Sequence, residues 1–298
     1  MNSVSQKKHY ILDGYIKLVE DYKQKNNLFN LISQDKKIFE CSVDASENCI
    51  MDSQNIYYFA GRIFDKSDYT YLLNDDSCAA DKVSNINIVA KGYELYGEKF
   101  FERLRGKYSI VIINKFKNQI ILIRDRSGLI PLYFYKDKSS LFFSINLKDL
   151  LNYKFKKILN KEKIIEYFSL YNFSKTSTFY KGVNRVEANS ILRFDFNKSM
   201  KISTKKVEKA NQLQDSNINF IDIFKRSINF NKSKKSGVIL SGGIDSASIA
   251  CSIKDNYEES QLSTYSIDYD SDNYAYYKKS SEKKYQDIIK DKIKSTHN

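Results

Sequence analysis

The chain of 298 residues is long enough for one large domain or two ordinary ones, and its 42% hydrophobic and 14% aromatic residues are typical of a folded protein. Its formal net charge of +13 comes from lysines dispersed along the whole sequence, which argues against a nucleic-acid-binding surface, where the charge would cluster on one element. No apolar run approaches the roughly 18–20 residues of a membrane-spanning helix, and the charged N-terminal region lacks the pattern of a secretion signal.

Residues 56–147 predict a strand-rich region, because short apolar runs alternate there with polar turns. Helical spacing of apolar residues over 86–104, interrupted at Gly97, predicts a helix between the first strand and the others. Strands that pair in sequence order indicate an antiparallel sheet with helices on its faces. The expected strands are 57–63, 108–114, 119–124, 132–135 and 141–144.

A further helix is predicted at 161–172 and a strand at 191–196. The order of predicted helices and strands then changes near residue 205. Residues 201–216 are polar, so we expect the domains to span 1–205 and 206–298. Beyond this boundary helices and strands alternate, which is typical of a parallel α/β sheet. The expected elements are helix 220–230, strand 238–240, helix 246–253, strand 262–267 and helix 282–293.

The segment GVILSGGIDS at 237–246 is the most informative in the chain. An apolar strand runs into two glycines, which let backbone N–H groups approach a phosphate, and then into a helix whose positive dipole end faces the same place. Ser241 and Ser246 add hydroxyl donors. We assign Asp245 to Mg²⁺, because a carboxylate beside a bound anion requires a cation between them. Residues 237–254 therefore predict an ATP-pyrophosphatase loop.

Other readings of this segment predict different chemistry. An ordinary strand-to-helix turn, in which Asp245 or Ser246 only caps the helix, is the alternative. The chain has no G-x-x-x-x-G-K-[ST] segment for a γ-phosphate and no G-x-G-x-x-G segment for a dinucleotide. A loop that holds pyrophosphate suits attack at the α-phosphate, which releases pyrophosphate and leaves an acyl-adenylate.

Three further segments, together with this loop, resemble the asparagine synthetase family, which includes β-lactam synthetases and lasso-peptide cyclases. The strongest is RDRSGLIPLY at 124–133, which is similar to the family's R-D-x-x-G-x-x-P-L-Y turn. The others are GEKFFERLRGKYS at 97–109 and TFYKGV at 178–183 with Arg185. Residues 262–297 resemble the second strand and helix of the synthetase domain. Together these segments extend the resemblance over roughly residues 56–297.

The resemblance implies an α+β domain followed by an α/β domain. The first is an Ntn-type (class II glutamine amidotransferase-like) αββα sandwich, and the second is the first part of an adenine-nucleotide α-hydrolase-like (PP-loop) domain. In the family ATP and Mg²⁺ bind at this loop, a carboxylate is adenylated, and an amine then displaces AMP to form an amide. The resemblance implies Asp245 as metal ligand, phosphate contacts from Ser241, Gly242, Gly243, Asp245 and Ser246, and adenine contacts from Leu240, Ser266 and Ile267.

The chain departs from the family at the glutaminase site. A working glutaminase of this type begins Met-Cys, because the amino group of the cysteine serves as base for its own thiol, whereas this chain begins Met1-Asn2-Ser3. The family's N-G-E is replaced by Ala-Gly-Arg at 60–62, and its S-D-x-E by Ser-Asn-Ile-Asn at 84–87. An alanine side chain cannot donate to an oxyanion, and asparagines do not pair with an ammonium group as carboxylates do. We expect a retained sandwich without glutaminase activity, and assign no catalytic residue.

The sequence ends at Asn298, where the family would begin its third parallel strand, and the second S-G-x-G-S-D-E loop and later catalytic lysine have no counterpart. The first hypothesis is an ATP-dependent, AMP-forming amide-bond ligase, acting on a small-molecule or peptide carboxylate with ammonia or a substrate amine. The second is a catalytically dead remnant or split-enzyme subunit that binds a partner chain completing the synthetase domain.

The remaining polar residues predict structure rather than chemistry. Residues 124–126 (Arg-Asp-Arg) are expected to pin a strand-end turn. His9 and His297 lie at opposite ends of the chain, which argues against a histidine metal site or triad. The cysteines lack C-x-x-C spacing, so we expect free thiols in a reducing cytoplasm, at Cys41, Cys49, Cys78 and Cys251.

Overall fold

The computed structural model divides the chain into two units, Met1–Asn211 and Gln212–Asn298. It describes residues 13–19, 28–32, 38–43, 49–73, 83–137, 140–153, 155–171, 175–198, 201–207, 219–229, 235–256, 261–267 and 282–297. The division falls beyond the expected boundary near residue 205, because the polar residues Lys201–Lys206 form a strand, β12, rather than a linker. None of the described helices is both long and apolar enough to cross a membrane.

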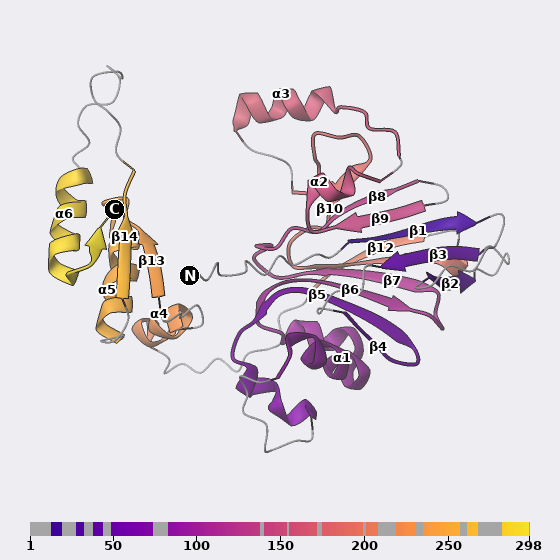
Figure 1. The fold of residues 1–298 in the computed structure, drawn as a ribbon, viewed down its shortest axis with the longest axis horizontal. Coiled ribbons are helices and arrows are strands. Elements are labelled where there is room, and N and C mark those ends of the chain that lie inside the picture. Colours follow the sequence, from indigo (N-terminus) through magenta and orange to yellow (C-terminus); the bar gives the residue numbers. More distant parts are fainter. Residues whose placement is uncertain are drawn as a thin grey trace, which may run out of the picture. The chain divides into compact units, whose positions relative to one another are not determined.

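The first unit contains two six-stranded antiparallel sheets (Figure 1). The sheet that we call the β1 sheet has the order β10 (Val183–Arg185), β8 (Tyr133–Lys136), β9 (Ser140–Ser144), β1 (Asp13–Val19), β3 (Ile38–Val43) and β2 (Leu28–Ile32). The β6 sheet has the order β12 (Lys201–Lys206), β11 (Ser190–Asp195), β7 (Gln119–Arg124), β6 (Gly106–Asn114), β5 (Asn55–Ile63) and β4 (Cys49–Met51).

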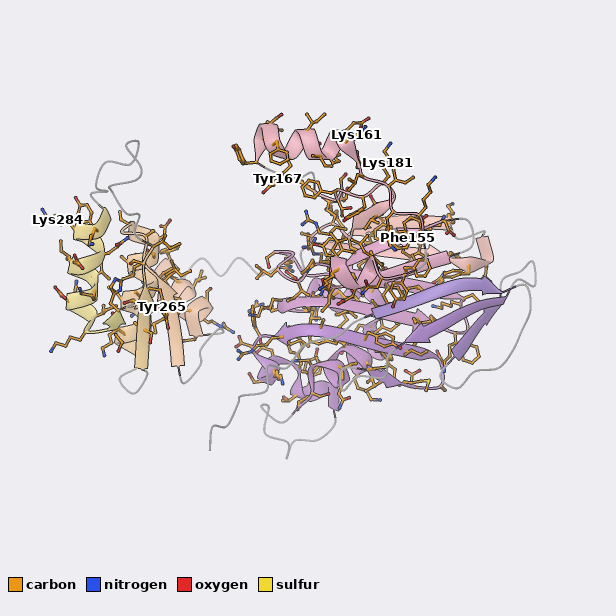
Figure 2. The ribbon with its side chains drawn as sticks, turned by 45° about the horizontal axis from the view of Figure 1, so that its top comes forward. Phe155, Lys161, Tyr167, Lys181, Tyr265 and Lys284 are labelled. Atoms are coloured by element: carbon orange, nitrogen blue, oxygen red, sulfur yellow. The ribbon has the colours of Figure 1, made fainter. Side chains whose placement is uncertain are left out.

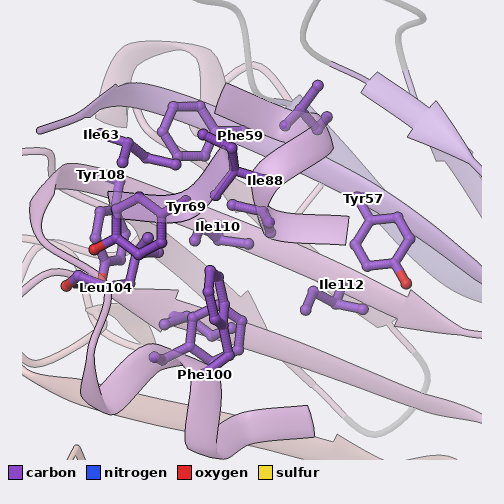
Figure 3. Close-up of a cluster of buried hydrophobic side chains, with 14 of the residues drawn as sticks. Tyr57, Phe59, Ile63, Tyr69, Ile88, Phe100, Leu104, Tyr108, Ile110 and Ile112 are labelled. Atoms are coloured by element: carbon purple, nitrogen blue, oxygen red, sulfur yellow. Dashed lines mark hydrogen bonds between the residues drawn. The ribbon is translucent and has the colours of Figure 1, made fainter. Parts of the chain in front are cut away.

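Alternating residues of the strand β5 separate two cores. Tyr58 and Ala60 belong to the core between the sheets, together with Phe143 of β9. Tyr57 and Phe59 belong to a core on the opposite face of the β6 sheet, beneath α1 (Asn85–Tyr96) and the 3₁₀ helices η1 (Lys66–Leu73) and η3 (Gly97–Glu102) (Figure 3). Because side chains along a strand point alternately to its two faces, a nearly continuous apolar strand is buried on both sides.

A helical layer also covers the outer face of the β1 sheet. Leu150 of α2 (Leu147–Leu150) is fully buried against Phe142 and Val183. The Phe155 ring stacks on Tyr135 with a centroid distance of 4.0 Å (Figure 2). A longer helix, α3 (Lys161–Leu170), follows, and the short η4 (Phe196–Lys198) connects β11 to β12. The order helix, sheet, sheet, helix confirms the predicted αββα sandwich.

The turn after β7 is held by two buried charges, as the sequence predicted. The Arg124 guanidinium donates to the carbonyls of Ile130 (2.9 Å), Val186 (2.7 Å) and Gly128. The Asp125 carboxylate accepts hydrogen bonds from the Ser127 N–H and hydroxyl at 2.9 and 2.6 Å, the Gly128 N–H at 2.7 Å and the Tyr108 N–H at 3.2 Å. Burial, and then the nearby charge of Arg185, lower the pKa of Arg124.

The second unit is a small parallel sheet with the strand order β13 (Lys235–Ile239), β14 (Gln261–Tyr265) and β15 (Thr296–His297). Val238, Leu240 and Leu262 pack with Ala250 of α5 (Ile244–Asn256) and Ile293 of α6 (Glu282–Ile293). The helix α4 (Phe220–Asn229) precedes β13. The predicted alternation is confirmed, but β15 adds a short third strand before Asn298 where the sequence predicted none.

The same sheet exposes an apolar face. Ile239 and Ile267 are 68% and 71% exposed, and Tyr265 is 45% exposed. These residues alternate along the chain with Val238, Leu240 and Leu262, which are buried with the helices. Parallel sheets are normally covered on both faces, so we define these three residues as the open face of the second unit.

We predict that Arg124→Met destabilises the chain by about 3 kcal/mol or more, because three carbonyl groups lose a charged donor. The midpoint of urea unfolding followed by circular dichroism measures this loss. The matched control is Arg126→Met, since Arg126 is exposed and, within the described part of the chain, donates only to the Glu102 carbonyl. Its expected effect lies within about 0.5 kcal/mol, and equal effects of the two variants would contradict the prediction.

Candidate functional site

The predicted phosphate loop lies where β13 and β14 end side by side. The Leu240 N–H donates to the Tyr265 carbonyl at 2.8 Å, and the Ser266 hydroxyl donates to the Leu240 carbonyl at 3.1 Å. These two bonds fix the carboxyl ends of neighbouring parallel strands at one edge of the sheet. Ligands of open α/β sheets bind at this edge.

The Ser246 hydroxyl organises the loop between β13 and α5. It accepts from the Ser241 N–H at 3.2 Å, lies 3.1 Å from the Ser241 hydroxyl oxygen and donates to the Gly243 carbonyl at 3.1 Å. The Gly243 N–H donates to the Ser241 hydroxyl oxygen at 3.3 Å. Gly242 has a φ of +83°, a conformation that glycine adopts without steric cost. The two serines and two glycines therefore form one closed turn.

The first turn of α5 presents unsatisfied donors beside this closed turn. Ala247 is the first residue of the helix whose N–H bonds back to the loop, at the Gly243 carbonyl. Among the described residues, the preceding N–H groups of Ile244, Asp245 and Ser246 have no acceptor. Ser241, Gly243 and Asp245 are exposed, so an anion from solvent can reach these donors. The arrangement fits a phosphate group.

Asp245 fits the role of a magnesium ligand only in combination with phosphates. Its exposed carboxylate lies in the first turn of α5. Across the described part of the chain, no group of three or more His, Cys, Asp or Glu side chains could hold a metal ion. Mg²⁺ is commonly held by one or two carboxylates together with nucleotide phosphates and waters. A single carboxylate beside phosphate donors is compatible with that coordination.

The three residues expected at the adenine differ in exposure and in the hydrogen-bonding groups that they have available. The Leu240 side chain is buried in the core, and both of its backbone polar groups already form hydrogen bonds. Ser266 uses its hydroxyl to hold Leu240, whereas Ile267 is exposed. The Tyr265 ring is a further exposed surface at this end of β14. A Cβ added to Gly237 would lie 3.2 Å from this ring, so the glycine leaves room for it.

The residues expected to stand in place of the glutaminase motifs have structural roles here. Ala60 is buried in the core between the sheets. Gly61 has a φ of +122°, and its backbone approaches β6 so closely that an added Cβ would lie 2.0 Å from the Lys107 carbonyl oxygen. Asn85 accepts from the Ile63 N–H at 3.4 Å, and Ser84 caps α1 by accepting from the Asn87 N–H at 3.2 Å. The structure therefore brings these residues together around one end of β5.

The predicted nucleophile position and several other residues lie outside the described part of the chain. Met1, Asn2, Ser3 and His9 are among them, and the first described strand, β1, begins at Asp13. Cys78 also lies outside, while Cys49 and Cys251 are free thiols. His297 lies on β15, with its Nδ1 3.0 Å from the Thr264 hydroxyl oxygen. This contact joins β15 to β14.

Comparison with known proteins gives matches over both units. Residues 42–206 match the family model of the glutamine amidotransferase domain, and residues 222–298 match that of asparagine synthase. The chain is 26% identical over 254 residues to a putative glutamine-hydrolyzing asparagine synthetase 2 of Methanocaldococcus jannaschii, a match that covers 81% of this chain and 47% of the relative. It is 25% identical over 186 residues to glutamine-hydrolyzing asparagine synthetase 2 of Bacillus subtilis, covering 56% and 25%.

Among solved structures, the chain is similar to glutamine phosphoribosylpyrophosphate amidotransferase from B. subtilis. The TM-score is 0.37 and the sequence identity 11%, with 92% of this chain and 64% of that chain covered. The chain spans less than half the length of the two asparagine synthetases it matches.

We predict that Ser246→Ala loosens the loop without unfolding the second unit. The Ser241 amide loses its acceptor, and its hydrogen exchange should accelerate about fivefold for roughly 1 kcal/mol of lost hydrogen bonding. Nuclear magnetic resonance measures this exchange directly. The control is Ser248→Ala in the same helix, which should leave Ser241 unchanged. An unchanged rate in Ser246→Ala would show that the hydroxyl does not organise the loop.

Proposed function

The chain belongs to the asparagine synthetase family, with a glutamine amidotransferase domain ahead of its asparagine synthase segment, and we propose that it acts in ATP-dependent, AMP-forming amide-bond synthesis. In this proposal a carboxylate oxygen attacks the α-phosphorus of ATP, pyrophosphate leaves, and an amine nitrogen then displaces AMP from the acyl-adenylate. The loop between β13 and α5 is the part of the site that this chain supplies.

The observation that supports this proposal most strongly is the closed turn at Ser241–Ser246 with free N–H groups behind it. The leaving pyrophosphate gains negative charge as the bond to the α-phosphorus breaks. Backbone donors at a helix N-terminus are already oriented toward that charge, so they stabilise it without reorganising. Mg²⁺, held by Asp245 and the phosphates, would neutralise part of the same charge.

The residues around one end of β5 support ammonia or a substrate amine as the nitrogen source. Ala60 offers no polar atom beyond its backbone, and Asn85 is engaged with the Ile63 N–H. Neither side chain supplies an ionised carboxylate for the amino group of glutamine. We therefore propose that the first unit keeps the amidotransferase fold without releasing ammonia from glutamine. The carboxylate substrate in this proposal is a small molecule or a peptide.

A second candidate function is a subunit that binds a partner chain and has no activity alone. The open face of the second unit, formed by Ile239, Tyr265 and Ile267, is the observation that favours it. A partner that covers this face would complete the layer that a parallel sheet requires. Both candidate functions include a cytoplasmic location, which the free thiols of Cys49 and Cys251 support.

We predict that the chain binds ATP more tightly with Mg²⁺ than without it, and that Asp245→Ala removes the difference. Loss of a charged metal ligand should weaken Mg·ATP binding about tenfold and leave metal-free ATP unaffected. Isothermal titration calorimetry of the full chain measures both affinities. Asp291→Ala, which removes an exposed carboxylate on α6, is the control. Equal Mg·ATP binding by wild type and Asp245→Ala would reject Asp245 as the metal ligand.

We also predict that the purified chain releases no ammonia from glutamine above the rate in buffer, because Ala60 supplies no oxyanion donor and Asn85 supplies no carboxylate. A coupled assay with glutamate dehydrogenase measures the ammonia, with a glutamine-hydrolysing asparagine synthetase as positive control. Ammonia released in proportion to the protein concentration would contradict the proposed nitrogen source while leaving the ATP loop untested by this assay.

A further inference from the structure

A cavity of about 300 Å³ lies in the first unit between the edge strands of its two sheets. Residues of β8 and β10 line it from the β1 sheet, and residues of β11 and β12 line it from the β6 sheet. At roughly 30 Å³ for each water-sized group, the volume holds about ten non-hydrogen atoms. The cavity is thus large enough for a small organic molecule.

The inner wall of this cavity is apolar. Phe134, Val186 and Leu192 line it, and the Phe134 ring is held edge-on by Phe194 at a centroid distance of 5.6 Å. Ile202 completes the wall from β12 and remains 43% exposed. It is the one apolar residue of an otherwise polar strand, Lys201–Lys206. An aromatic or branched aliphatic group in the cavity would cover this residue.

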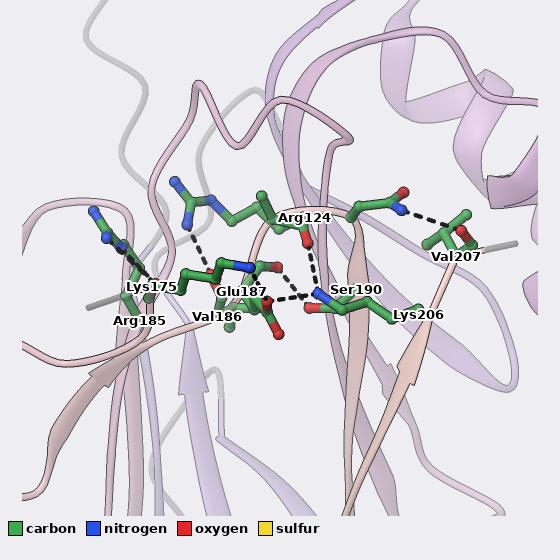
Figure 4. Close-up of polar contacts among 10 residues, drawn as sticks. Arg124, Lys175, Arg185, Val186, Glu187, Ser190, Lys206 and Val207 are labelled. Carbon is green, nitrogen blue, oxygen red and sulfur yellow. Dashed lines mark hydrogen bonds and ion pairs between the residues drawn. The ribbon is translucent and has the colours of Figure 1, made fainter. Parts of the chain in front are cut away.

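Charged side chains lie in this cavity and beside it, and Figure 4 shows the contacts among them. Glu187 lines the cavity and pairs with Lys206 at 2.8 Å and with Lys175 at 3.8 Å. The hydrogen bond from Lys206 lowers the pKa of Glu187. Arg185 lines the cavity as well, and donates from Nε and Nη2 to the Lys175 carbonyl at 3.3 Å each. Two lysines therefore pair with the one carboxylate, and the guanidinium of Arg185 lines the same cavity.

We propose that this cavity binds a small organic anion, an apolar carboxylate whose ring or branched chain lies against Phe134, Leu192 and Ile202 while its carboxylate pairs with Arg185. An apolar pocket with a few polar groups at one side is the usual form of a small-molecule site. A guanidinium recognises a carboxylate through charge-assisted hydrogen bonds. This site goes beyond the proposed function, because the ATP loop lies in the other unit and shares no residue with it.

The test compares phenylacetate with phenylacetamide, which has the same shape without the charge, by calorimetric titration of the full chain. Phenylacetate should bind saturably at one site, and the amide about tenfold more weakly. Absence of saturable phenylacetate binding up to about 10 mM, or equal binding of acid and amide, would overturn the proposal.

Three variants test the placement of the ligand. Arg185→Gln should weaken phenylacetate binding about tenfold, and Glu187→Gln should strengthen it, because each removes one charge of opposite sign at the rim. Ile202→Trp should abolish binding by filling the cavity, and Ile202 is exposed enough for the protein to fold normally, which circular dichroism checks. Shifts of the same sign in the two charge variants, or full binding by Ile202→Trp, would reject the site. Asp245→Ala should bind phenylacetate normally, so failure here is distinguishable from failure at the ATP loop.

Discussion

The first unit depends on the buried guanidinium of Arg124, because this one side chain fixes two of the connections between the two sheets, from β7 to β8 and from β10 to β11. Arg124 stands at the end of β7 in the β6 sheet. Its donors hold the carbonyl of Ile130, just before β8, and that of Val186, just after β10. A buried charge is costly unless its donors are satisfied, so the two connections cannot separate from β7 without exposing an unpaired cation. The same constraint places Val186 and Arg185 at the cavity between the sheet edges.

This framework does not require the polar groups that we propose are missing from the glutamine site. The sandwich is stabilised by the apolar faces of β5, β6 and β7 and by the Arg124 turn, and none of these needs a polar group at the end of β5. Ala60 adds apolar surface to the core, and Asn85 accepts a hydrogen bond from the Ile63 backbone. Fold and chemistry are therefore separable in this unit, as they are in many enzyme folds.

Much of the fold could be predicted from the sequence, although the four strands before residue 52 were not predicted. The hairpins of β6 with β7 and β8 with β9 were predicted because their buried faces leave apolar runs between polar turns. β12 was missed because all six of its residues are exposed, so an edge strand without a buried face has no apolar period. The Ser-Gly-Gly turn was predicted because local chemistry specifies it. The cavity could not be, since its lining joins strands from Phe134 to Thr204 that only the pairing of the sheets brings together.

The open face of the second unit has a consequence for how this protein behaves in concentrated solution. Ile239, Tyr265 and Ile267 form an exposed apolar surface on a parallel sheet, and such surfaces associate with copies of themselves. The high positive net charge opposes this attraction at low ionic strength, where like-charged molecules repel one another over longer distances. Added salt screens that repulsion while leaving the apolar attraction in place. Colloidal stability should therefore decrease as the salt concentration is raised. Single chains should predominate in dilute samples at low salt.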